Sequence, residues 1–172
     1  MADKGYAFLI VGHSNFGKSE TLWALTDYAE KRGKQPPCTI AGVDFFVRRM
    51  SNDDAPYQNP RSYEEFVEAI GAEPERYRNF ISAFCPRFSE KKTERFLSAF
   101  KERHDVYAMV IRQSHKGDAT VSDEEIALLS KYLAPDIGVL IFSKFPHTRD
   151  QRAGVFRGFI ARTVANVVLD DE

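Results

Sequence analysis

Hydrophobic positions along the chain fall into blocks whose spacing changes from one block to the next. A continuous apolar run at residues 6–11 predicts a strand that is buried on both faces, and residues 105–111 predict another buried strand. Residues 137–142 also predict a strand. A further strand is expected within residues 38–47, and residues 163–169 predict a fifth. The chain therefore alternates between strand patterns and segments of another periodicity.

In those other segments, apolar residues recur every three or four positions, which predicts amphipathic helices. One helix is expected to begin near Lys18 and to stop at Gly33, and another to span residues 149–162. Ser122 and Glu125 have the spacing of a capping box, so a helix is expected to begin there.

The middle of the chain, residues 50–104, is predicted to contain loops and helices but no strand. Ser62 and Ser89 are expected to begin two of these helices. A third is expected to begin at Pro74 and to be closed by Pro86, because proline suits the first turn of a helix and cannot continue one.

Strands that alternate with helices predict an α/β fold. We expect a Rossmann-like, three-layer α/β/α sandwich around a mainly parallel sheet of about five strands. Residues 50–104 exceed the length of one crossover helix, so they are predicted to form a helical insertion, or lid, between the second and third strands. With 172 residues, the chain is expected to be a single domain over residues 1–172.

Composition narrows the class of protein. The chain is 43% hydrophobic and 28% charged with a net charge of -1, which argues against a general nucleic-acid coat or a membrane-surface binder. Cys38 and Cys85 lack the spacing of a metal site, and two reduced thiols suit a cytoplasmic protein. The apolar run at residues 6–11 is too short to span a bilayer and has no cleavage site behind it, so we expect neither a membrane segment nor a signal peptide.

Residues 12–19, G-H-S-N-F-G-K-S, match the pattern G-x-x-x-x-G-K-[ST] at every fixed position. Gly12 and Gly17 allow backbone angles at which successive N–H groups can point at phosphate oxygens. Lys18 brings a positive charge to the β- and γ-phosphates, and Ser19 offers a hydroxyl to Mg²⁺. The helix that begins near Lys18 directs the positive end of its dipole at the same anion.

On this motif the chain resembles the P-loop NTPase superfamily, which implies a parallel sheet with a Mg²⁺-nucleotide bound at the loop. Eight matching residues indicate the superfamily and not the member. The resemblance makes Ser19 the metal ligand. It implies nucleotide contacts at Gly12, His13, Ser14, Asn15, Phe16, Gly17, Lys18, Ser19 and Glu20.

Beyond the loop, the chain resembles small nucleotide and polynucleotide-end kinases. In these enzymes the second strand is followed by an Asp and then an Arg that hold the phosphate acceptor, and Asp44 and Arg48 have that spacing here. The resemblance implies that Asp44 orients or deprotonates an acceptor hydroxyl and that Arg48 holds an acceptor phosphate. The alternative is that Asp44 caps a turn and Arg48 is a solvated strand residue.

Such kinases also close arginines over the triphosphate, where the positive charge stabilises the transition state. Arg149 and Arg152 are spaced to share one helix face and are candidates for this catalytic role, together with Lys18. Arg112 follows a predicted strand, where the carboxyl edge of the sheet meets the substrate. For each arginine the alternative is an ordinary surface position.

The loop also resembles the variant G-x-x-N-x-G-K-S of translation-factor-type GTPases. Pro146, however, stands where those proteins carry the Asp that selects guanine, and Arg112 stands where the D-x-x-G switch would begin. These differences favour ATP over GTP and argue against a working GTPase switch. A degenerate relative that binds nucleotide stays open.

P-loop ATPases normally end a buried strand with a carboxylate, and the predicted third and fourth strands lack one. The only apolar run that ends in acids is the last, followed by Asp170, Asp171 and Glu172. These residues form either a solvated tail or a substitute for the missing carboxylate. Asp44 is the other candidate for the outer shell of Mg²⁺.

The sequence thus favours an ATP- and Mg²⁺-dependent phosphotransferase of the nucleotide-kinase kind, acting on a small-molecule or nucleotide acceptor. The alternative is a regulatory or assembly NTPase, in which nucleotide binding orders the helical insertion for a protein partner. A third hypothesis is a nucleotide-binding module without catalysis. No membrane partner is expected.

Overall fold

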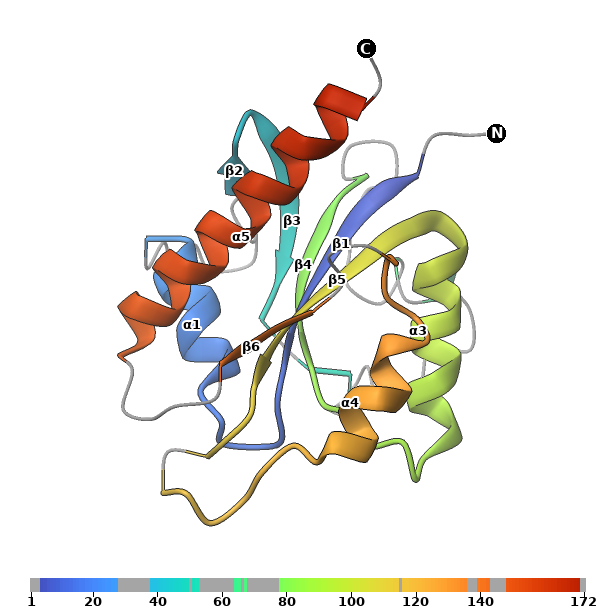
Figure 1. Cartoon of the computed structure of the whole chain (residues 1–172), viewed down its shortest axis with the longest axis vertical. Coiled ribbons are helices and arrows are strands. Elements are labelled where there is room, and N and C mark those ends of the chain that lie inside the picture. The colour runs from blue at the N-terminus through green and yellow to red at the C-terminus, as the bar shows by residue number, and fades with distance from the viewer. Residues whose placement is uncertain are drawn as a thin grey trace.

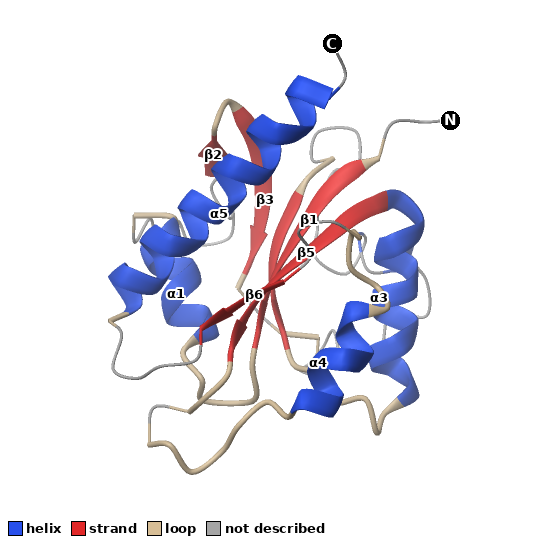
Figure 2. Ribbon diagram, viewed as in Figure 1, coloured by secondary structure: helices blue, strands red, loops and turns tan. Residues whose placement is uncertain are grey.

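The computed structural model has an α/β fold, built on one six-stranded and mostly parallel sheet with the order β2-β3-β4-β1-β5-β6. Helices α1 and α5 lie on one face of the sheet, and α3 and α4 lie on the other (Figures 1 and 2). The predicted class is confirmed, and the layout is compatible with a Rossmann-like arrangement. The structure describes residues 4–27, 38–49, 51–52, 64–65, 67, 78–114, 116–135, 139–142 and 148–170.

The centre of the sheet consists of β1 (Gly5–Val11), with β4 (Phe80–Phe84) on one side and β5 (His104–Ile111) on the other. Both neighbours run parallel to β1. Residues 7–11 of β1 have no exposed surface, as their continuous apolar sequence predicts for a strand covered on both faces. Because all three strands point the same way, their carboxyl ends meet at one edge of the sheet.

Two aromatic clusters hold the helices to the sheet. Toward α5, Phe8 stacks on Tyr107 with ring centroids 5.0 Å apart and meets Phe159 edge-on at 5.9 Å. Toward α3, Phe96 stacks on Phe84 of β4 with ring centroids 5.6 Å apart, and Phe100 meets Phe80 edge-on at 6.0 Å. Burial of such rings is the main favourable term for packing helices on a sheet.

The sheet continues on one side to β6 (Val139–Phe142), which pairs with β5. On the other side β3 (Val43–Arg48) pairs with β4, and β2 (Cys38–Ile40) pairs antiparallel with β3. The single strand expected within residues 38–47 is therefore a hairpin. Ala41 and Gly42 both have positive φ, 51° and 80°, as a two-residue hairpin turn of type I′ requires.

The prediction of a purely helical insertion at residues 50–104 is wrong. Phe80–Phe84, expected to lie in a helix that began at Pro74, is the buried strand β4 between β3 and β1. Its five residues are all buried, and backbone pairing on both sides outweighs the helical spacing of the apolar residues. The following α3 (Lys91–Arg103) is the crossover helix from β4 to β5.

Three helix starts can be compared with expectation. Helix α1 (Lys18–Leu25) begins at Lys18 as predicted, but the expected end at Gly33 is wrong, because the helix ends at Leu25 with Thr26 as its C-cap and a left-handed Asp27 after it. Residues 28–33 lie outside the described residues. Helix α4 (Asp123–Ser130) has the predicted capping box. Helix α3 has Glu90 rather than Ser89 at its N-cap and no side-chain cap, and Ser62 lies outside the described residues.

The last helix, α5 (Arg149–Asp170), includes the segment at residues 163–169 that was predicted to be a strand. That prediction is wrong, because Phe156, Ile160 and Val164 recur every four positions and are all buried. This spacing continues the apolar face of the preceding helix against the sheet. Among the described residues, no helix combines the length and apolarity needed to cross a bilayer.

Candidate functional site

The loop between β1 and α1, residues 12–17, lies at the carboxyl edge of the sheet. Gly12 donates its N–H to the carbonyl of Phe84 at the end of β4, at 3.0 Å. The ring of Phe16 is buried against Gly12, where a Cβ would come within 3.0 Å of the Cβ of Phe16. A residue larger than glycine at position 12 would therefore press on the side chain of Phe16, which would have to shift to make room.

The backbone of this loop has left-handed residues at alternate positions, Asn15 with φ 65° and Gly17 with φ 80°. Asparagine and glycine are the residues that adopt this conformation most readily. Left-handed residues within a turn line up successive N–H groups along a concave surface, which is a common anion site. Gly17 is also the N-cap of α1 and supplies no side-chain cap, so the first turn keeps its N–H groups toward the loop.

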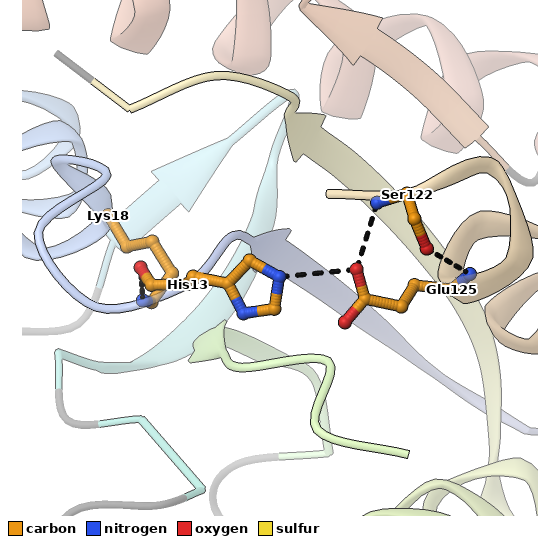
Figure 3. A network of polar contacts seen from close by, with 4 residues as sticks. All are labelled: His13, Lys18, Ser122 and Glu125. Carbon is orange, nitrogen blue, oxygen red and sulfur yellow. Dashed lines mark hydrogen bonds and ion pairs between the residues drawn. The ribbon is translucent and has the colours of Figure 1, made fainter. Parts of the chain in front are cut away.

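Lys18 lies across this loop. Its side chain is 7% exposed, and Nζ donates to the carbonyl oxygen of His13 at 2.7 Å (Figure 3). The structure thus places the ammonium group at the N-terminus of α1, next to the left-handed segment. This arrangement holds a nearly buried positive charge where an anion would bind.

His13 links the loop to α4. Its Nε2 lies 3.2 Å from Oε2 of Glu125, and its ring meets Phe16 edge-on at 5.5 Å. The same Oε2 accepts the N–H of Ser122 at 2.9 Å, so Glu125 closes the capping box and contacts the loop (Figure 3). Sequence reasoning found the capping box but missed the contact with His13, because only the sheet order brings α4 beside the loop.

Ser19, the expected metal ligand, is exposed in the first turn of α1. Its hydroxyl donates to the carbonyl of Arg49, after β3, at 3.2 Å. The guanidinium group of Arg49 in turn lies over the ring of Trp23, 5.4 Å from its centroid. The start of α1 is thus joined to the carboxyl end of β3.

The structure brings Arg152 to the loop. Its Nε donates to Oγ1 of Thr21 at 2.9 Å, and Nη2 lies 2.7 Å from where a Cβ on Gly17 would stand. Burial lowers the pKa of Arg152, and the negative charge of Glu20 opposes that effect. Arg149, expected to act with it, is exposed in the first turn of the same helix.

The structure does not bring Asp44 to the loop. Asp44 is exposed near the start of β3, and its carboxylate accepts the hydroxyl of Thr39 at 2.5 Å. Phe46 of β3 and Ala7 of β1 both pair with Phe80 of β4. Asp44, two residues before Phe46, is therefore level with Gly5, the first residue of β1. The loop begins seven residues further along β1, or ~23 Å at the rise of a strand.

The two remaining candidates lie nearer the carboxyl edge. Arg48 ends β3 and is 2% exposed, and its Nη2 donates to the carbonyl of Ser51 at 3.3 Å. Arg112 follows β5, as expected, but its Nη2 lies 2.5 Å from Oδ1 of Asp123 in the first turn of α4. Arg48 is therefore a buried strand residue, and Arg112 is directed at α4.

Neither strand beside β1 ends in an acid. Cys85 follows β4, and its N–H and C=O are both bound by the side chain of Asn52, at 2.6 and 3.2 Å. Asp170 ends α5, at the edge of the sheet opposite the loop (Figure 1), and residues 171–172 lie outside the described residues. In the described part of the chain, no cluster of three His, Cys, Asp or Glu side chains could hold a metal.

No protein-family model, curated protein or solved structure matches the chain. The chemistry of the site therefore has to be inferred from its own residues. These are a left-handed loop, a nearly buried lysine, an exposed serine hydroxyl and the start of a helix, all at one edge of the sheet.

Proposed function

We propose that this chain binds the Mg²⁺ complex of a nucleoside triphosphate at the β1–α1 loop. The observation that carries the proposal is the position of Lys18, nearly buried across a loop with left-handed residues at Asn15 and Gly17. A triphosphate would take the ammonium group from the carbonyl of His13 and accept the N–H groups of the loop and of the first turn of α1.

The charges around the loop support a polyanion. Lys18 and Arg152 are both 7% exposed; Lys18 follows Gly17 in the chain, and Nη2 of Arg152 lies 2.7 Å from where a Cβ on Gly17 would stand. Removing two positive charges from water is costly unless an anion or hydrogen-bond acceptors compensate. Phosphate oxygens at the N-terminus of α1 would supply that compensation and interact favourably with the helix dipole.

The residues present fit a magnesium ion in part. Ser19 offers a hydroxyl at the start of α1, and a bound Mg²⁺ would neutralise charge between the β- and γ-phosphates. Cys85 and Arg112 follow the strands beside β1 where a carboxylate would be expected. We therefore propose that phosphate oxygens and water supply most of the ligands of the metal, which Mg²⁺ commonly accepts.

Among the classes open from the sequence, we favour a nucleotide-dependent regulatory or assembly NTPase over a nucleotide kinase. Asp44, the proposed acceptor-binding group of the kinase, lies at the opposite edge of the sheet. We propose instead that bound nucleotide acts on the two elements that contact the site, since Ser19 of α1 is bonded to Arg49 after β3 and His13 of the loop contacts Glu125 of α4. ATP is proposed rather than GTP because of Pro146, which lies outside the described residues.

The test is a titration of the wild-type chain with Mg²⁺–ATP and Mg²⁺–GTP by calorimetry, repeated with Lys18→Ala. We expect Lys18→Ala to weaken nucleotide binding by about 100-fold or more, because a charge-assisted contact to phosphate is lost. Lys116→Ala, which removes an exposed lysine from the β5–α4 connection, is the matched control and should bind like the wild type.

Two outcomes would contradict parts of the proposal. A wild-type chain that binds neither nucleotide would contradict nucleotide binding itself. Phosphate transferred to a nucleotide or sugar acceptor from a pool, and lost in Lys18→Ala, would favour the kinase over the regulatory NTPase. Slow hydrolysis without use of an acceptor is the expected result.

A further inference from the structure

A continuous series of polar contacts runs from the loop to α4 (Figure 3). Lys18 donates to the carbonyl of His13, and the ring of His13 contacts Glu125. Glu125 accepts the backbone N–H of Ser122, and Ser122 Oγ accepts the backbone N–H of Glu125 at 3.1 Å. The cap of α4 and the residue that holds the ammonium group of Lys18 therefore belong to one network.

We infer that Glu125 is a positioning residue for the triphosphate site and acts on the loop through His13. The inference rests on the proposed nucleotide binding and adds a residue that the loop motif does not contain. Glu125 is the member of the acidic first turn of α4 whose carboxylate contacts the loop, whereas Asp123 pairs with Arg112.

The physical argument concerns the backbone of His13. Its ring is fixed on one side by Glu125 and packs edge-on against the buried ring of Phe16. Because the ring of His13 is held at two points, the backbone of His13 has less freedom to rotate. The carbonyl of this backbone accepts the ammonium group of Lys18. The loop is therefore held in one conformation before the ligand arrives, which lowers the entropy lost on binding.

Glu125 is itself held in place. Its carboxylate accepts the N–H of Ser122 at 2.9 Å, and its own N–H is bound by the hydroxyl of Ser122. Its side chain is 22% exposed and that of His13 is 27% exposed, so solvent competes only in part for their contact. The bond from the backbone N–H of Ser122, which a change of the side chain at position 122 does not remove, fixes the position of the carboxylate.

Coupling between Glu125 and the triphosphate site must be reciprocal. If Glu125 favours the conformation of the loop that binds triphosphate, bound triphosphate must favour the contact between His13 and Glu125. We expect nucleotide to slow hydrogen exchange at the backbone N–H of Glu125, which donates to Ser122 within the network. A cap that served only α4 would not respond to a ligand at the loop.

The experiment compares variants of the full chain by nucleotide titration. Glu125→Ala and His13→Ala should each weaken binding of Mg²⁺–ATP about tenfold, the effect of one hydrogen bond to a charged group. The double variant should be no weaker than either single variant, because both remove the same contact. Glu125→Gln keeps an acceptor oxygen and should bind within about threefold of the wild type.

Ser122→Ala is the matched control. It removes a cap bond of α4 but leaves the carboxylate of Glu125 and the ring of His13 in place, so affinity should change less than about twofold while α4 is destabilised. Equal losses of affinity in Ser122→Ala and Glu125→Ala would assign the effect to the cap and overturn the inference.

Other outcomes are equally decisive. Unchanged affinity in Glu125→Ala, or additive losses in the double variant, would overturn the positioning role while nucleotide binding stands. A wild-type chain that binds no nucleotide would overturn both the proposed function and this inference. If Glu125→Ala fails to fold, His13→Ala, Glu125→Gln and hydrogen exchange at Glu125 make the same comparison.

Discussion

Gly17 and Gly154 differ in what a methyl group would meet. Gly17 has φ 80°, and a Cβ there would lie 2.7 Å from Nη2 of Arg152. Gly154, in the second turn of α5, would place its Cβ in open space. At the scale of single residues, a side chain at the last position of the loop would have to displace the guanidinium group of Arg152.

We predict that Gly17→Ala lowers the free energy of unfolding by about 1–2 kcal/mol or more, because a left-handed backbone and a displaced arginine both carry a cost. Gly154→Ala should raise it by about 0.5–1 kcal/mol, since alanine is the better helix former. Urea denaturation of both variants measures the two changes. Equal and small effects would mean that the loop can rearrange around a methyl group.

At the scale of elements, the β2–β3 hairpin decides where Asp44 lies. Because Ala41 and Gly42 form the turn, the strand restarts at Val43 and runs toward the carboxyl edge. Asp44 therefore stands near the beginning of a strand, whereas the expected pattern needs it after the end of one. Its bond to Thr39, across the hairpin, is a local contact between β2 and β3.

From this placement we predict that Asp44→Asn leaves the affinity for Mg²⁺–ATP and the rate of turnover unchanged. Stability should fall by less than about 0.5 kcal/mol, because the side chain is exposed and asparagine can still accept the hydroxyl of Thr39. Calorimetry measures the affinity, and a phosphate-release assay measures the rate of turnover. A tenfold loss of turnover with intact binding would return Asp44 to the mechanism.

At the scale of the whole molecule, His104 lies where three parts of the fold meet. It begins β5, its Nδ1 is 3.2 Å from the carbonyl of Phe100 in α3, and its Nε2 is 3.1 Å from the carbonyl of Arg78, just before β4. Burial lowers the pKa of His104 from 6.5 to about 4, although the two backbone carbonyls act in the opposite direction. The folded chain thus keeps this histidine neutral in mildly acidic solution.

The sign of the pH dependence follows from the two protonation states. Between pH 6.5 and about 4 the unfolded chain binds a proton at His104 that the folded chain does not, so stability is lost as the pH falls through this range. The expected slope from His104 is about 1.4 kcal/mol per pH unit. Urea denaturation between pH 7 and 4.5 should show a shallower slope in His104→Gln, and equal slopes would contradict the pKa of the folded state.

The local pattern of residues was sufficient for much of the fold. The apolar runs that became β1 and β5 were found from the sequence because a strand covered on both faces is apolar throughout. The run that became β6 was found too, although this strand lies at an edge of the sheet with Val139 and Ile141 exposed. The start of α1 and the capping box of α4 were found for a similar reason, since each depends on residues within one turn. The hypothesis of nucleotide binding likewise rests on eight adjacent positions, residues 12–19.

What the sequence left undecided depends on contacts between distant segments. The identity of Phe80–Phe84 as a strand depends on pairing with β1 and β3, and the helical state of residues 163–169 depends on burial of Val164 beside the sheet. Only the sheet order could bring Glu125 to His13 and Arg152 to Gly17, because each pair is more than a hundred residues apart in the chain. The sequence by itself determined the loop and its backbone requirements, and the tertiary structure decided which side chains surround that loop, because sheet pairing and helix packing set distances that local spacing does not.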